Sequence, residues 1–117
     1  MDFENLLFVI PLLCGAVFLL AGLILHRFPP KNINALYGYR TPASMKSQER
    51  WDFAQQFSAR QLINFGLALM AASCLGLIIE TTTTTGLVFG LGIMIVGVVL
   101  MILRIEKEIK KRFESQP

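Results

Sequence analysis

The feature that most constrains this chain is the absence of charge over long stretches of it. No charged side chain lies between Leu6 and Leu25, a run of 20 residues. As an α-helix such a run is about 30 Å long, which matches the hydrocarbon thickness of a bilayer. Two further uncharged runs extend from Gln61 to Ile79 and from Thr81 to Leu103. Because backbone groups in lipid must find hydrogen-bond partners within the segment, all three runs are predicted to be helical.

The predicted fold is therefore an all-α membrane protein with three transmembrane helices and a cytoplasmic amphipathic helix between the first and the second. The expected spans are residues 6–25, 61–79 and 86–103 of one domain, residues 1–117. The third span is expected to begin only at Gly86, because the five threonines before it are poor helix formers. With 54% hydrophobic and 16% charged residues, the composition excludes disordered and collagen-like chains.

The basic residues predict how the helices are oriented. All eleven Lys and Arg residues lie in two segments, between Arg27 and Arg60 and between Arg104 and Arg112. With three spans these segments lie on the same side, and the positive-inside rule places the loop 26–60 and the tail 104–117 in the cytoplasm. The N-terminus is expected outside. The basic excess is thus a topology signal, and we expect no nucleic-acid partner.

The loop between the first two spans is expected to be ordered, since it is rich in aromatic residues. A helix begins within it, with Thr41-Pro42, Ser44 and Ser47 as alternative N-caps. We expect this helix at the cytoplasmic interface, with Trp51 at headgroup depth. It is either a plain anchor or a functional element, and either separate from the second span or continuous with it.

This loop carries a motif whose residues stand at a characteristic spacing. They are Asn34, Gly38, Arg40, Thr41, Ser44, Ser47 and Trp51. In this spacing the segment resembles the motif of the SdpI family of bacterial membrane proteins. The resemblance implies a multi-span protein of the bacterial inner membrane with the motif in a cytoplasmic loop. It also implies an immunity or resistance factor against a secreted peptide toxin, one that also recruits a cytoplasmic regulator.

The chemistry of the motif allows two interpretations. The guanidinium of Arg40, beside Gly38, offers a five-donor fork suited to a lipid phosphate or a partner carboxylate. Asn34 and Thr41 would brace that loop through hydrogen bonds to its backbone. Alternatively the loop is purely structural, and Arg40 pairs with Glu49 or Asp52.

The spans contain few polar groups. In the second span we expect Asn64 to be the most buried polar residue, as an interhelical hydrogen-bond partner and not as part of a transport path, while Asn5 marks the outer edge of the first span. Gly86, Gly90, Gly92 and Gly97 give the third span a small-residue face. That face serves either packing within the chain or a homo-oligomer formed through the third span.

No enzymatic site is predicted. The chain contains no Ser/His/Asp set, no HExxH motif and no phosphate-binding glycine loop. Two cysteines and one histidine are too few for a zinc site, so neither a metal nor another cofactor is expected. Besides toxin immunity, the alternative function is that of an accessory, scaffold or lipid-binding membrane protein without a toxin partner.

Overall fold

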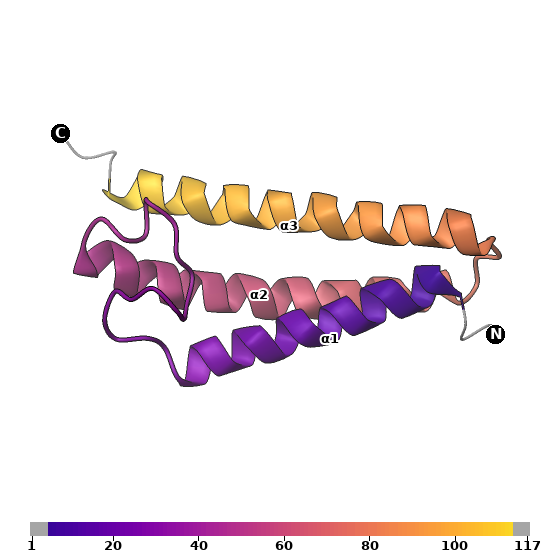
Figure 1. Ribbon diagram of the computed structural model, residues 1–117, viewed down its shortest axis with the longest axis horizontal. Coiled ribbons are helices and arrows are strands. Elements are labelled where there is room, and N and C mark those ends of the chain that lie inside the picture. Colours follow the sequence, from indigo (N-terminus) through magenta and orange to yellow (C-terminus); the bar gives the residue numbers. More distant parts are fainter. Residues whose placement is uncertain (1–4, 114–117) are drawn as a thin grey trace.

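Three long helices make up the protein in the computed structural model, which describes residues 5–113 (Figure 1). They are α1, Leu6–Arg27, α2, Gln48–Gly76, and α3, Thr83–Phe113. Successive helices run in opposite directions and form an elongated bundle of 53 × 28 × 21 Å. The described part of the chain contains no strand, which confirms the all-helical prediction there. Two helices, α1 and α3, are long and apolar enough to cross a membrane.

The second helix shows which of the two alternatives for the amphipathic segment holds. The amphipathic segment and the second uncharged run form one continuous helix of 29 residues. It is less apolar than α1 and α3, since it carries Arg60, Gln61 and Asn64 beside its apolar residues. A membrane crossing by α2 therefore stays a prediction. The helix also ends at Gly76, before the expected limit at Ile79.

An asparagine at the start of α1 fixes where α2 ends. The Asn5 Oδ1 caps α1 by accepting from the backbone N–H of Leu7 at 2.9 Å. Its Nδ2 donates to the carbonyl oxygens of Gly76 at 2.9 Å and Ile79 at 2.7 Å. Asn5 thereby satisfies the last carbonyl of α2, which has no intrahelical partner, and one carbonyl of the segment that follows the helix. The expectation for Asn64 was wrong, because its side chain is exposed and the buried polar side chain of the second span is that of Ser73.

Glycines set the distance between α1 and α2. A Cβ atom added at Gly66 would lie 2.6 Å from the backbone nitrogen of Leu19. One added at Gly15 would lie 2.8 Å from the carbonyl oxygen of Gly66. Both separations are below normal contact, so the two backbones meet where neither residue has a side chain. Such close approach is the usual role of small residues between membrane helices.

The helix α3 begins within the threonine run, earlier than expected. The Thr82 Oγ1 accepts from the backbone N–H of Thr85 at 3.1 Å, and the Thr82 carbonyl accepts from Gly86 at 2.8 Å. This N-cap starts the helix at Thr83 despite the low helix propensity of threonine. Gly86 and Gly90 are buried, and a Cβ at Gly90 would lie 3.1 Å from Ile10 of α1. The glycine pair thus serves contact within the chain, and an oligomer through α3 stays a prediction.

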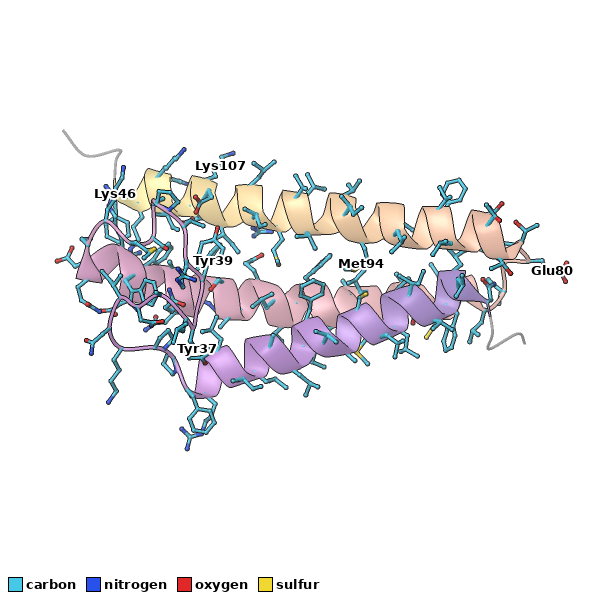
Figure 2. All side chains as sticks on the ribbon, in the orientation of Figure 1. Tyr37, Tyr39, Lys46, Glu80, Met94 and Lys107 are labelled. Atoms are coloured by element: carbon cyan, nitrogen blue, oxygen red, sulfur yellow. The ribbon has the colours of Figure 1, made fainter. Side chains whose placement is uncertain are left out.

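The two basic segments lie at the same end of the bundle. The loop between α1 and α2 and the final turns of α3 are side by side there (Figure 1). Lys46 and Lys107 mark this end, and Glu80 lies at the opposite end (Figure 2). The helix arrangement agrees with a common side for both segments, while the side of the membrane they occupy stays a prediction.

Candidate functional site

The motif loop, residues 28–47, folds onto the first turns of α2 and the last turns of α3 (Figure 1). Beneath it lies a small core formed by Ala43, Ala54, Ile105 and Ile109. The loop and both helices each contribute to this core. All seven motif residues lie in the loop, at the N-cap of α2 or in the first turn of that helix.

A glutamine of α2 holds the centre of the loop. The Gln55 Oε1 accepts from the backbone N–H of Tyr39 at 2.7 Å, and its Nε2 donates to the Tyr39 carbonyl at 2.8 Å. The side-chain amide thus pairs with both polar groups of one residue. Gly38 precedes this contact with a φ of 109°, and a Cβ there would lie 2.6 Å from the Gln55 Oε1. Only glycine fits this backbone conformation at this separation without strain.

Asn34 and Arg40 close the first half of the motif. The Asn34 Oδ1 accepts from the backbone N–H groups of Leu36 at 2.9 Å and Tyr37 at 2.7 Å. The Arg40 Nε donates to the Asn34 carbonyl at 2.9 Å, and the Arg40 side chain is exposed. The alternative in which Arg40 pairs with Glu49 or Asp52 has no counterpart among the contacts of the described residues.

Thr41 and Ser44 form a single helical turn that does not continue. The Ser44 N–H donates to the Thr41 Oγ1 at 3.2 Å, and the Met45 N–H donates to the Thr41 carbonyl at 3.0 Å. The fully buried Ser44 hydroxyl accepts from the Thr41 N–H at 2.9 Å. Of the three alternative caps, Ser47 is the N-cap of α2, because its Oγ accepts from the Arg50 N–H at 3.1 Å.

Trp51 anchors the loop from below. Its side chain is completely buried, and its Nε1 donates to the Pro30 carbonyl at 2.8 Å. The buried indole therefore does not face lipid directly, and its expected position at headgroup depth stays a prediction. The indole is covered by the loop because its N–H reaches the carbonyl of a proline that follows the first helix.

Besides Gln55, sequence reasoning missed Tyr39 and Glu106, which join the loop to α3. Glu106 of α3 accepts at one carboxylate oxygen from the Tyr39 hydroxyl at 2.9 Å and from the Thr41 Oγ1 at 3.0 Å. Figure 2 shows Tyr39 on the side of the loop that faces α3. Burial, reinforced by the hydrogen bond to Glu106 and by its charge, raises the pKa of Tyr39 above its ordinary range. No local pattern links residues so far apart in the sequence.

Tyr37 was also absent from the predicted set. Its hydroxyl donates to the Phe28 carbonyl at 2.7 Å, directly after the end of α1. In this way the loop supplies a donor to the carbonyl end of the first helix, which would otherwise lack one. The motif loop is thus tied to all three helices.

The matches to known proteins cover the region that contains the motif loop. The SdpI/YfhL protein family matches residues 31–103, more than half of the chain. The chain belongs to this family. It is also 33% identical over 102 residues to YfhL of Bacillus subtilis (strain 168), a protein described as uncharacterized, with 87% of each chain covered. No solved structure matches.

Family membership and the two apolar helices together indicate a membrane protein of the SdpI/YfhL family. The family match includes every motif residue and ends just before Glu106. Among the described residues no group of three or more His, Cys, Asp or Glu side chains is placed to hold a metal. What the site offers chemically is an ordered loop with the exposed Arg40 guanidinium on its surface.

Proposed function

We propose that this protein is an integral membrane immunity or resistance factor that protects a bacterial inner membrane against a secreted peptide toxin. In this proposal all three helices cross the membrane, the N-terminus lies outside, and the motif loop and the C-terminal tail lie in the cytoplasm. The loop then also offers a surface for a cytoplasmic regulator.

The observation that carries the proposal is the motif loop itself. Residues 31–47 of this loop lie within the region shared with the SdpI/YfhL family. Its internal hydrogen bonds use backbone groups. The Arg40 guanidinium stands exposed at its surface, and among residues 5–113 its one hydrogen bond is from Nε to Asn34. A rigid loop that presents an exposed arginine is suited to bind a carboxylate or a phosphate group of a partner.

The test is survival of a toxin-sensitive bacterium that expresses the protein, challenged with membrane-active peptide toxins. We expect the wild-type chain to raise the toxin concentration needed for killing about tenfold or more, and Arg40→Gln to lose most of that protection. Losing one charge-assisted hydrogen bond is worth about 1.5–3 kcal/mol, which corresponds to roughly a tenfold change or more in binding.

The matched control is Lys31→Gln, which removes another exposed cation from the same loop. Its protection should equal that of the wild type at equal membrane abundance. If wild-type expression leaves sensitivity unchanged for every toxin tried, the immunity function is contradicted. An accessory or scaffold role without a toxin partner would then be favoured.

A further inference from the structure

A groove runs along the surface between α2 and α3, away from the motif loop. It consists of two hollows of about 350 and 570 Å³ that share Phe65 and Gly97 as lining residues. The smaller hollow lies toward the basic end of the bundle and the larger toward the middle of α3. The shared residues make the two hollows neighbours along the two helices.

The end of the groove near the basic segments is polar. Gln61, Asn64 and Arg104 line it, and no acidic residue does. Asn64 and Arg104 are exposed, and neither has a hydrogen-bond or ion-pair partner within residues 5–113. The guanidinium of Arg104 is therefore a cation available to a ligand at the mouth of the groove.

The rest of the groove is apolar. It is lined by Phe65, Val88, Phe89, Gly92, Ile93, Val96 and Gly97. A Cβ atom added at Gly92 would meet nothing within 4 Å, whereas one added at Gly97 would lie 2.6 Å from the Phe65 ring. The Phe65 ring thus forms the floor of the groove beside Gly97, and the space above Gly92 is open.

The protein does not fill this space because the contacts that hold α3 lie near the two ends of the helix. Near its start α3 contacts α1 through Gly86 and Gly90. Near its end it packs beneath the motif loop through Ile105 and Ile109. The groove lies between these two contact regions, where α3 has no loop to cover it.

The dimensions and polarity fit one class of occupant. From Arg104 to Val88 the groove follows α3 for about 24 Å, which exceeds the depth of one leaflet of a hydrocarbon core about 30 Å thick and leaves room for one acyl chain along it. An unpaired amide such as that of Asn64 is costly in lipid unless it finds a partner. A cation and amide donors at the mouth, followed by an apolar channel, match the headgroup and one chain of an anionic phospholipid.

We propose that this groove binds one acyl chain of an anionic phospholipid of the surrounding leaflet, with the lipid phosphate held by Arg104 and Asn64. The lipid completes the α2–α3 surface and satisfies both polar groups. The inference requires α3 to lie in the membrane, and it does not rest on the toxin-protection proposal, since its readout is lipid retention.

The experiment is native mass spectrometry of the full chain, purified in mild detergent and titrated with phosphatidylglycerol or phosphatidylcholine. We expect the wild type to retain one phosphatidylglycerol per chain in preference to phosphatidylcholine. Gly92→Phe, which places a ring in the open part of the groove, should abolish retention of either lipid. Arg104→Gln should weaken phosphatidylglycerol binding about tenfold and remove the preference, since one charge-assisted contact is lost.

Two controls match these variants. Val99→Phe adds the same ring at an exposed position of α3 outside the groove, and Lys107→Gln removes an exposed cation one turn beyond Arg104. Both should bind lipid as the wild type does. If Gly92→Phe lowers the melting temperature, Asn64→Leu replaces it and should weaken phosphatidylglycerol retention without filling the groove.

Three results would overturn the proposal. The first is unchanged lipid retention in both Gly92→Phe and Asn64→Leu. The second is an equal loss of binding in Lys107→Gln and Arg104→Gln, which would mean attraction to the general charge of this end. The third is conversion of an oligomer to a monomer by Gly92→Phe with lipid retention intact, which would assign the groove to a second copy of the chain.

Discussion

One carboxylate joins the motif loop to α3. The hydroxyls of Tyr39 and Thr41 both donate to the same oxygen of Glu106. Hydrogen bonds to a charged acceptor are stronger than those between neutral groups, and a half-buried pair of donors orients the loop as well as stabilising it. Beside the bonds from Gln55, the contact of residues 39–41 with α3 therefore depends on the charge of a single side chain.

The tyrosine in this contact should titrate at unusually high pH. The chain has two tyrosines, so in Tyr37→Phe the tyrosinate absorbance reports Tyr39 alone. Burial, with the bond to and the charge of Glu106, raises the pKa of Tyr39, and ionisation should therefore lie above that of a free tyrosine near pH 10. The corresponding contribution to stability is complete below about pH 10 and is lost as the pH rises toward the folded-state pKa.

Glu106→Gln separates the causes in that titration. The amide keeps an acceptor at the same place and removes the negative charge, so the Tyr39 pKa should fall part of the way toward its ordinary value. An unchanged titration in Glu106→Gln would show that the carboxylate does not act on Tyr39.

Gly38 should be intolerant of any side chain. Gly38→Ala forces a Cβ onto a backbone with a φ of 109° and into contact with the Gln55 Oε1. We expect a loss of about 1–3 kcal/mol in the free energy of unfolding, measured as a lower melting temperature in detergent. The control is Leu36→Ala in the same loop, whose side chain is 95% exposed and whose removal should change little. Equal melting temperatures for the two variants would contradict the role of Gly38.

Among the elements, α2 is a helix that makes two separate sets of contacts along its length. At 29 residues it is about 44 Å long, well beyond the thickness of a hydrocarbon core. Its first turns carry Trp51 and Gln55, which serve the motif loop, and its later turns carry Gly66 and Gly76, which serve α1. One rigid rod therefore connects the loop to the helix contacts.

The contact between α1 and α2 predicts a sharp difference between glycines. Gly66→Ala places a methyl group 2.6 Å from the Leu19 nitrogen, so the helices must separate. We expect a destabilisation of about 1–3 kcal/mol, typical of overpacking. Gly92→Ala is the matched control, because its methyl group meets nothing within 4 Å and alanine favours the helix. A melting temperature for Gly66→Ala at or above that of Gly92→Ala would refute the close approach.

The helices were largely predictable from sequence, and their ends were not. Uncharged runs predict where helical segments lie because lipid permits little else. The end of α2 at Gly76 depends on the Asn5 side chain, and the start of α3 depends on the Thr82 hydroxyl. Each of these hydrogen bonds is a tertiary or capping detail that composition and propensity do not contain.

The same division applies to the site. The motif residues were recognisable by spacing, and the order of the loop was predictable from its aromatic content. Their partners Gln55 and Glu106 were not, because each lies on a helix that the sequence does not place against the loop. The burial of Trp51 was not predictable for a related reason, since an amphipathic pattern does not reveal that a loop covers its apolar face.

For the whole molecule, the distribution of charge between the two ends predicts its orientation. In a chain with Cys14 and Cys74 replaced by alanine, single cysteines at Lys46 and Glu80 report the two ends (Figure 2). We expect a membrane-impermeant thiol reagent applied to intact cells to label Glu80→Cys and not Lys46→Cys. After the membrane is opened, both should react, since both positions are exposed.

A different labelling pattern would change the proposed topology. Labelling of both cysteines in intact cells, or of neither, would mean that α2 does not cross the membrane. Labelling of Lys46→Cys alone would invert the chain. Either result leaves the described helix contacts intact, since these are independent of the direction of insertion.

The bond between the loop and Glu106 has a consequence for how the chain is made. Thr41 leaves the ribosome 65 residues before its partner. During synthesis the loop is therefore able to pair with Gln55 early, while the carboxylate that orients Tyr39 and Thr41 arrives only when α3 is nearly complete. The loop can therefore reach its final hydrogen-bonded position only after residue 106 has been translated, when most of α3 has been made.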